Sequence, residues 1–396
     1  MFSGAQSVLI SGGTFNVAAP PPLRVAQEPA EIFHLTPPCA ADLCACALLN
    51  RTWTLLAQKL IFSTIFIQWN LESSTRLARL VLILEVSPHL VDHVCELHLA
   101  LPPGINPSDV ERLSEFPFPR LHTLSLTCVS TRLSSACLPS MRRLLAKPGV
   151  TTVAFTCGFE DPDEYFDVWD GCSMSIRRLH LNFYPEPPPS FTPGSREKRV
   201  PIEVMDGLPL IVYYWSDPRC PFDLSTLRAV QLRGRYPRLP TEDLTAAARE
   251  KIEIVSVQIY WEHIDLSAFG CIKQLIVAVD AEDVAPTLQT IRSLSDSASK
   301  TLQVVRLDVK LRPVTHNPLP LEGLFQAIEE VKGLLSHSGL RVVEVLLPIE
   351  TPRLLPLDSI DHGAGQQDGR VDIRWNFRPE EPENWSVLIR IPGEVA

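Results

Sequence analysis

The stretch Val94-Cys95-Glu96-Leu97-His98-Leu99 decides the fold, because apolar side chains occupy its first, fourth and sixth positions. The last two of these alternate with polar neighbours, as in a strand that buries one face. The same spacing recurs along the chain, with most copies roughly 20 to 40 residues apart. The other copies are Leu121/Leu124/Leu126, Val150/Val153/Phe155, Ile176/Leu179/Leu181, Leu227/Val230/Leu232, Ile252/Val255/Val257, Ile272/Leu275/Val277, Leu302/Val305/Leu307, Leu340/Val343/Val345 and a weaker one, Leu208/Ile211/Tyr213.

Helix-like stretches lie between the strand-like copies. One strand and one helix cannot bury both of their apolar faces alone, but stacked neighbours can. The pattern therefore predicts an α/β fold, a curved solenoid with a parallel sheet on its concave side. A doubly wound α/β domain is the alternative, which the absence of a glycine-rich first turn disfavours. The helix-like stretches are Pro107–Glu115, Leu138–Ala146, Thr241–Lys251, Val284–Ser295 and Leu321–Ser336, and Ser73–Val86 precedes the first copy.

A second apolar region, Asp42–Ile67, precedes the repeats. The Asp42 carboxylate can accept amide protons of a first helical turn and so cap a helix. Apolar residues then follow at helical steps of three or four, with polar residues on the opposite side. This region contains no catalytic group, so we interpret it as a hydrophobic docking module. The apolar positions are Cys46, Leu49, Trp53, Leu56 and Leu60, and the polar ones are Arg51, Thr54 and Gln58.

This region resembles an F-box, especially those of fungal F-box proteins. The resemblance covers about 35 to 40 residues, and the repeats resemble the irregular leucine-rich repeats that follow fungal F-boxes. It implies that the chain docks on a Skp-type adaptor and its cullin complex. The residues that carry it are Pro29-Ala30-Glu31-Ile32-Phe33, His34-Leu35, Asp42-Leu43, Leu48-Leu49, Arg51, Trp53 and Leu60-Ile61-Phe62. The adaptor contacts it implies are Pro29, Ile32, Leu43, Leu48, Leu49 and Trp53.

These features predict the domain organisation. Residues 1–22 form a flexible leader, and residues 23–70 form the helical F-box-like region. Residues 71–350 form the leucine-rich-repeat-like solenoid, with a flexible insertion at about 184–201 that is rich in proline and charge. Residues 351–396 contain a loop and two capping strands, Val371–Phe377 and Trp385–Ile391, which we expect to form a terminal hairpin.

Composition narrows the function classes. A net charge of −10 and a pI near 5.5 argue against binding to nucleic acid or to an anionic membrane. No apolar stretch is long enough to span a bilayer. The 10 cysteines form no Cys-x-x-Cys pair, so free thiols in a reducing compartment are the simplest interpretation. We therefore expect a cytoplasmic or nuclear protein.

Aromatic residues beside acidic ones are the candidate target contacts. The segment 159–170 follows a repeat strand, but its residue order does not suit a calcium loop. A solvated loop is the simpler interpretation, and a partner-contact loop is the alternative. The aromatic pairs after two other strand-like runs have the same two readings, core packing or target contact. The candidate target contacts are Tyr165, Trp169, Tyr214 and Trp261.

The sequence predicts no catalytic residue, no metal site and no cofactor. His98 and His180 lie between the last two apolar positions of their copies, so they should point away from the buried face. No nucleophile elbow, phosphate loop or Cys/His pair is present.

The first hypothesis, which rests on the resemblance, is a non-enzymatic substrate-recognition subunit of a cullin-RING (SCF-type) ubiquitin ligase that captures a target protein of unknown identity. The second is a repeat scaffold for protein–protein interaction, in which a degenerate F-box only covers the first repeat. Its short first helix motivates this reading. The third, an innate-recognition module, is suggested by the leader Val8–Asn16.

Overall fold

The chain forms two compact units in a computed structural model. Unit 1 comprises residues 1–176 and 183–186, and unit 2 comprises residues 177–182 and 187–396. Both contain strands paired in parallel and helices, which confirms the predicted α/β class. The structure describes residues 45, 48, 50–67, 73–101, 105–159, 162–181, 199–206, 220–234, 249–259, 263–280, 284–310, 328, 329, 331, 333, 340–348 and 372–378.

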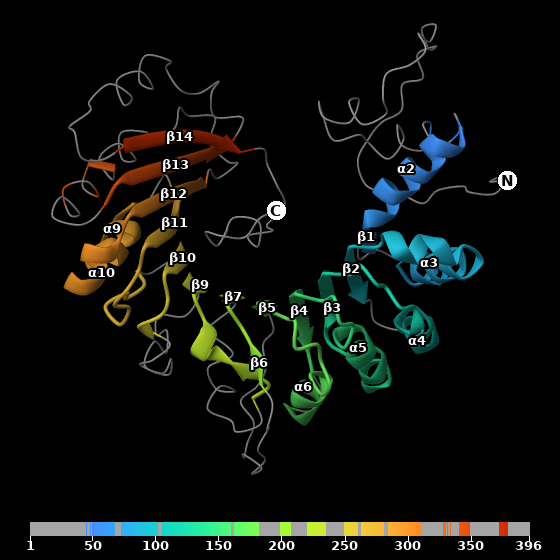
Figure 1. The fold of residues 1–396 in the computed structure, drawn as a ribbon. Coiled ribbons are helices and arrows are strands. Elements are labelled where there is room, and N and C mark those ends of the chain that lie inside the picture. The colour runs from blue at the N-terminus through green and yellow to red at the C-terminus, as the bar shows by residue number, and fades with distance from the viewer. Residues whose placement is uncertain are drawn as a thin grey trace, which may run out of the picture. The chain divides into compact units, whose positions relative to one another are not determined.

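Unit 1 has parallel strands in the order β1-β2-β3-β4, which is also their order in the chain. The helices α3, α4, α5 and α6 follow one another along one side of these strands (Figure 1). The elements are α2 (Arg51–Ser63), β1 (Thr64–Ile67), α3 (Ser73–Val86), η2 (Pro88–His93), β2 (Glu96–Leu101), α4 (Pro107–Glu115), β3 (Thr123–Arg132), η3 (Ser135–Cys137), α5 (Leu138–Leu145), β4 (Thr152–Gly158) and α6 (Pro162–Val168).

Unit 2 has parallel strands in the order β5-β7-β9-β10-β11-β12-β13-β14, and β6 pairs with β8 in a separate small sheet. The elements are β5 (Arg178–Leu181), β6 (Val200–Pro201), β7 (Val204–Asp206), β8 (Phe222–Asp223), η4 (Leu224–Thr226), β9 (Ala229–Gly234), β10 (Ile254–Ile259), β11 (Gln274–Asp280), α9 (Ala285–Arg292), α10 (Asp296–Thr301), β12 (Val304–Lys310), β13 (Val342–Pro348) and β14 (Asp372–Arg378).

The repeated apolar positions form the core of both units. In every strong copy the first, fourth and sixth side chains are buried, with at most 6% exposed. Neighbouring copies are also in register: Leu97 lies opposite Leu124, and Leu275 lies opposite Val305. The prediction that the fourth and sixth positions are buried strand positions is therefore confirmed.

The sheet begins earlier than the sequence analysis predicted. Thr64–Ile67 is strand β1, which pairs with β2 and aligns Ile65 with Leu97. The helical reading of residues 23–70 was wrong at this point. Phe62, Ile65 and Ile67 have the same spacing as the later copies, so the signal was present.

The structure adds strands that were not predicted, and two predicted strands lie outside the described residues. The strand between β5 and β9 is β7, which aligns Met205 with Leu179 and Val230, whereas the weak copy at 208–213 lies outside the described residues. Val200–Pro201, at the end of the predicted flexible insertion, is strand β6. At the C-terminal end, β14 continues the sheet in parallel with β13, and the second predicted capping strand, 385–391, lies outside the described residues.

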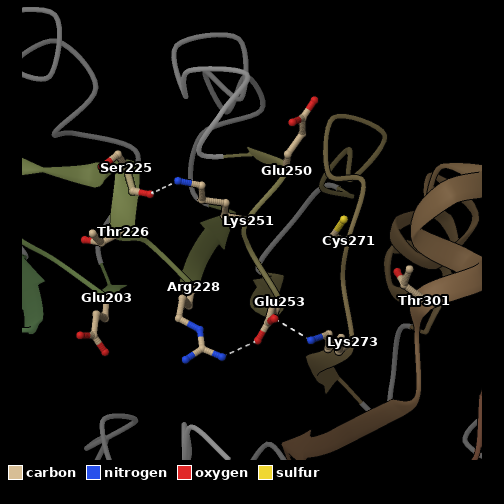
Figure 2. Close-up of a pocket in the computed structure, with 10 residues that line it drawn as sticks. All are labelled: Glu203, Ser225, Thr226, Arg228, Glu250, Lys251, Glu253, Cys271, Lys273 and Thr301. Carbon is tan, nitrogen blue, oxygen red and sulfur yellow. Dashed lines mark hydrogen bonds and ion pairs between the residues drawn. The ribbon is translucent and has the colours of Figure 1, made fainter.

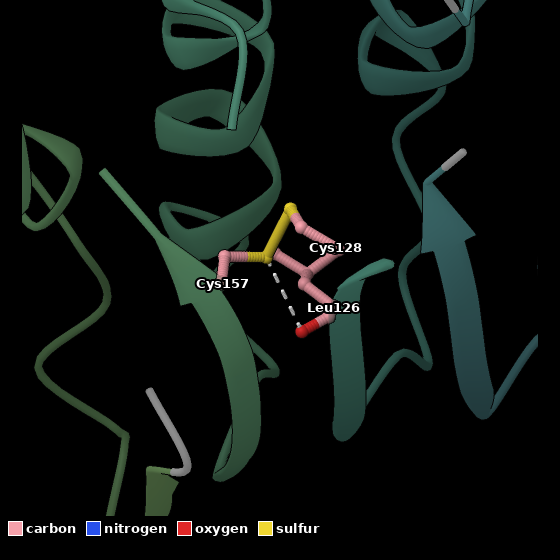
Figure 3. Close-up of a disulfide and its surroundings, with 3 residues drawn as sticks. All are labelled: Leu126, Cys128 and Cys157. Atoms are coloured by element: carbon pink, nitrogen blue, oxygen red, sulfur yellow. Dashed lines mark hydrogen bonds between the residues drawn. A yellow bond between two sulfur atoms is a disulfide. The ribbon is translucent and has the colours of Figure 1, made fainter. Parts of the chain in front are cut away.

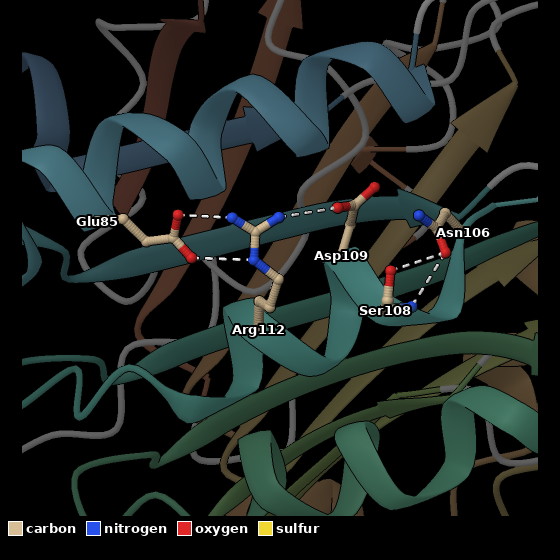
Figure 4. Close-up of polar contacts among 5 residues, drawn as sticks. All are labelled: Glu85, Asn106, Ser108, Asp109 and Arg112. Atoms are coloured by element: carbon tan, nitrogen blue, oxygen red, sulfur yellow. Dashed lines mark hydrogen bonds and ion pairs between the residues drawn. The ribbon is translucent and has the colours of Figure 1, made fainter.

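The helix predictions for unit 1 agree closely with the structure. Helices α3 and α4 begin and end at the predicted residues, and α5 ends one residue early. Asn106 explains where α4 begins, because its Oδ1 accepts hydrogen bonds from the Ser108 backbone N–H at 3.2 Å and from the Ser108 hydroxyl at 2.9 Å (Figure 4). Pro107 at the first helical position has no N–H that needs a partner.

Ion pairs connect successive helices of unit 1. Arg112 of α4 donates from Nε to Glu85 of α3 at 2.9 Å, and its other side meets Asp109 at 3.4 Å (Figure 4). The hydrogen bond to Glu85 raises the pKa of Arg112. The same arrangement joins α4 to α5 through Glu111 and Arg143 at 3.1 Å. Such half-exposed pairs fix the order of the helices more than they add stability.

Two cysteines are joined, which corrects the expectation that all are free thiols. Cys128 of β3 and Cys157 of β4 form a disulfide on the core side of their strands (Figure 3). They are 29 residues apart in the sequence. Parallel register brings them together, because Thr127 aligns with Thr156 one residue earlier. Among the described cysteines, Cys95, Cys137 and Cys271 are free thiols.

Candidate functional site

Of the predicted adaptor contacts, the structure describes Trp53 in helix α2 and Leu48, which lies just before that helix. Asn50 caps this helix, since its Oδ1 accepts a hydrogen bond from the Trp53 backbone N–H at 3.1 Å. Leu48 is 82% exposed, and the Trp53 side chain is half-buried. The other predicted contacts, Pro29, Ile32, Leu43 and Leu49, lie outside the described residues.

The apolar face predicted for the docking module is partly exposed on α2. Ala57 is the buried residue of the helix, whereas Leu60 of the predicted apolar face is 42% exposed. Leu55, which the sequence analysis did not single out, is 52% exposed. Helix α2 packs on η2 and β1, so its orientation depends on the sheet that follows. The exposed apolar side chains of Leu55 and Leu60 on α2, and of Leu48 just before it, are therefore available to a partner.

Tyr165 and Trp169 lie in the core and not on a contact surface. Each is only 1% exposed, in and just after helix α6. Trp169 packs on Phe155, with ring centroids 5.6 Å apart, and its centroid is 6.5 Å from that of Tyr165. The acidic neighbours suggested a loop, but burial of the rings against β4 favours a helix here. This corrects the prediction of an exposed contact loop, and Tyr214 and Trp261 lie outside the described residues.

His98 and His180 lie on the sheet face that points away from the core, as their positions in the sequence predict. His98 stacks on Phe66, with ring centroids 4.2 Å apart and an interplanar angle of 12°. His180 Nδ1 lies within hydrogen-bond distance of Asp206 Oδ2. In the orientation that satisfies both groups, the Gln231 amide donates to the same carboxylate at 2.8 and 3.0 Å. Aligned positions of neighbouring strands thus hold chains of polar contacts.

A charged groove runs along the edge of unit 2 where its strands begin. It has a volume of about 730 Å³. Figure 2 shows Arg228 and Lys273 directed at Glu253 from either side, at 2.8 and 2.6 Å. Its carboxylates and its cations are equal in number, so the groove has no strong net charge. The lining residues are Glu203, Ser225, Thr226, Arg228, Glu250, Lys251, Glu253, Cys271, Lys273 and Thr301.

The backbone explains why these charges form a row. The Arg228 carbonyl accepts hydrogen bonds from the N–H groups of Glu253 and Ile254, at 2.9 and 3.0 Å. The Glu253 carbonyl accepts two in the same way from the next copy, and so do equivalent carbonyls along unit 2. Side chains at this position therefore stack from copy to copy, with their charges alternating as Arg177, Glu203, Arg228, Glu253 and Lys273.

Glu253 is the most strongly paired member of this row. The hydrogen bond from Lys273 lowers its pKa most, the hydrogen bond from Arg228 lowers it further, and burial opposes both. The carboxylate therefore stays ionised at neutral pH. Because its two cations are half-exposed, the pairing sets the register of the edge and adds about 1 kcal/mol at most to stability.

The described residues contain no group of three histidine, cysteine or acidic side chains that could hold a metal ion. Among the described helices, none has the length and apolar character that a membrane crossing requires. No protein-family model matches the chain, and no curated protein matches it significantly.

Proposed function

We propose that this chain is a substrate-recognition subunit of a cullin-RING (SCF-type) ubiquitin ligase. In this proposal the F-box-like region, residues 23–70, docks on the Skp adaptor, and the repeats bind a target protein. The observation that carries the proposal is the pairing of two features in unit 1. Exposed apolar side chains on α2 and just before it, led by Leu48 at 82%, directly precede a sheet of regularly repeated strands. A docking helix joined to a repeat surface suits an adaptor-bound receptor.

The finer architecture belongs to the same proposal. We infer a leucine-rich-repeat-like solenoid, in which each copy stacks on the one before it. Its support is that strands pair in parallel in chain order within each unit, and that every strong copy buries the same three positions. Such stacking leaves a broad sheet face and its edges free to vary for target binding.

The mechanism requires no catalytic group from this chain. A receptor that holds adaptor and target together raises the concentration of the target near a ubiquitin-loaded enzyme. The role of the chain is then to bind the adaptor with one surface and the target protein with another. A protein with this role would act in the cytoplasm or the nucleus, where the ubiquitin machinery works.

The direct test is capture of the purified Skp adaptor by the full chain. The substitution Leu55→Asp places a charge on the exposed face of α2, and Leu48→Asp places one just before this helix. Leu49→Asp tests another predicted adaptor contact. The matched control is Met174→Asp, which changes a 48% exposed apolar residue elsewhere in unit 1. We expect these three variants to lose capture at least tenfold while the control keeps it. Capture that is absent in the unmodified chain, or unaffected by all three variants, contradicts the proposal.

A second candidate is a non-catalytic scaffold in which α2 only covers the first strand. The packing of α2 on η2 and β1 favours this reading. In this candidate the chain does not capture the adaptor, and Leu55→Asp does not change that result. Replacing buried Ala57 with Asp unfolds the part of unit 1 that contains α2. Thermal unfolding of the two variants, measured beside the capture experiment, separates the scaffold from the receptor.

A further inference from the structure

The two units differ on the sheet face that points away from the repeat core, which we call the second face. In unit 1, the second-face residues of β1 to β4 are half-buried or exposed, and most are threonine, serine or alanine. In unit 2, the corresponding residues Val204, Ala229, Ile254 and Ile276 form a buried apolar cluster. A partner can therefore reach the second face in unit 1 but not at this cluster.

One corner of the unit 1 second face has side chains suited to a specific contact. The Phe66 ring, which is 56% exposed, lies on β1 at the end of the strand order. One side of this ring stacks on His98 at 4.2 Å. Among the described residues, β1 is the end strand of the sheet, and no further described strand lies beside its outer edge.

The Glu96 carboxylate lies beside this ring pair. Its Oε2 is 3.6 Å from His98 Nε2 and accepts a hydrogen bond from the Thr64 hydroxyl at 3.4 Å. Its Oε1 has no hydrogen bond or ion pair with the described residues, and the side chain is 38% exposed. The nearby His98 ring lowers the pKa of Glu96 most, so the carboxylate is anionic at neutral pH.

We propose that Phe66 and Glu96 bind an arginine side chain from an extended segment of the target protein. The guanidinium is planar, so it can lie against the exposed Phe66 ring while its N–H groups donate to Glu96. Arginine suits this site better than lysine, because it can stack and donate two parallel hydrogen bonds at once. The small polar side chains of β3, Thr123 and Ser125, allow a backbone to approach the sheet.

This inference rests on the proposed role of the repeats in target binding, but not on adaptor binding. The probe is a fluorescent, end-capped nonapeptide of glycine and serine with one central arginine. Matched peptides carry lysine, citrulline or alanine at the centre, and citrulline keeps the shape of arginine without its charge. Anisotropy titrations with the full chain measure the affinity of each peptide. We expect the arginine peptide to bind at least tenfold more tightly than the citrulline peptide, with the lysine peptide between them.

Substitutions in the protein then locate the contact. Phe66→Ala and Glu96→Gln should each weaken binding of the arginine peptide about fivefold to tenfold, while Leu82→Ala, at a 56% exposed position on α3, should not change it. Phe66→Trp should tighten binding severalfold, because indole has the strongest attraction for cations, and misfolding cannot produce such a gain.

Equal binding of the arginine and citrulline peptides, no measurable binding of either, or no effect of all three site variants would overturn the inference. Failure here with adaptor capture intact would overturn only the arginine contact. Success here without adaptor capture would overturn only the ligase role.

Discussion

Unit 1 and unit 2 have the same pattern of buried core positions but differ on the second face of the sheet. On the core side, Leu97 in unit 1 and Leu275 in unit 2 are both fully buried. On the second face, Phe66 of unit 1 is 56% exposed, whereas Ile276 of unit 2 is 1% exposed. The core pattern therefore specifies the strand and its register, and the residues between the core positions decide whether the other face meets solvent.

The sequence of β11 explains the difference. Leu275-Ile276-Val277-Ala278-Val279 is a continuous apolar run, which is typical of a strand buried on both faces. Strand β3 alternates instead, as Thr123-Leu124-Ser125-Leu126-Thr127, which is typical of a strand with one wet face. The second face of unit 1 is therefore accessible to a partner at β3, whereas the second face of unit 2 is buried at β11.

The largest effect on stability should come from removing a buried apolar side chain on the second face of unit 2. Ile276→Ala removes a fully buried side chain and should lower the free energy of unfolding by about 3 to 4 kcal/mol. Phe66→Ala on the second face of unit 1 should cost less than about 1 kcal/mol, because that ring is mostly solvated. Urea unfolding of both variants measures the difference. Equal losses would contradict the contrast between the faces.

The disulfide provides a second test of the difference between the units, because it lies in unit 1. Reduction, or the double change Cys128→Ser and Cys157→Ser, should lower stability by about 2 to 3 kcal/mol, since the bridge closes a loop within unit 1. The control is Cys271→Ser in unit 2, a half-buried free cysteine, which should change stability little. Thermal unfolding with and without reductant, together with thiol counting, measures this. A chain that titrates with every thiol free and does not respond to reductant would contradict the bridge.

The charge row of unit 2 should give a smaller effect. Glu253→Gln removes one partner of two cations and should cost about 1 kcal/mol at neutral pH. The pKa of Glu253 is lowered in the fold, so its contribution is present above the ordinary carboxyl pKa of 4.5 and is lost as the pH falls through the lowered value. Unfolding midpoints of both proteins from pH 7 to pH 3 should therefore converge at the acid end. A constant gap across this range would show that the charge is not the cause.

The smallest effect should come from His93 in unit 1. Burial lowers its pKa most, and the neighbouring His89 lowers it further, so the fold favours the neutral ring. Stability from this group is present above the ordinary pKa of 6.5 and is lost as the pH falls through the lowered value. His93→Gln should remove a few tenths of a kcal/mol of the stability lost between pH 7 and pH 5. If the variant loses as much stability as the unmodified chain over this interval, another group is responsible.

The core of the fold could be predicted from the sequence because a strand repeats a local pattern. The buried positions of Leu124 and Val255 follow from spacing alone. The ends of α3 and α4 follow from a capping residue before the helix or a proline after it. The strand β1 was missed because Ile65 and Ile67 were assigned to a helical module, although their spacing matches the later copies.

The site was less predictable because it depends on contacts between strands. Tyr165 and Trp169 looked like surface residues because their neighbours are acidic, but the aromatic packing against Phe155 decides their burial. The pairs formed by Cys128 with Cys157 and by Phe66 with His98 join residues about 30 positions apart through strand register. A single sequence shows the residues in such pairs but not which ones meet.

One measurement tests the central claim, that the second face is open in unit 1 and closed around the buried apolar cluster of unit 2. Serine is changed to cysteine at one matched position of each unit, Ser125 on β3, which is half-buried, and Ser256 on β10, which is 2% exposed. Maleimide labelling of each folded variant is then followed peptide by peptide with mass spectrometry. We expect Ser125→Cys to be labelled at least tenfold faster than Ser256→Cys. Equal rates, or faster labelling at position 256, would contradict the claim.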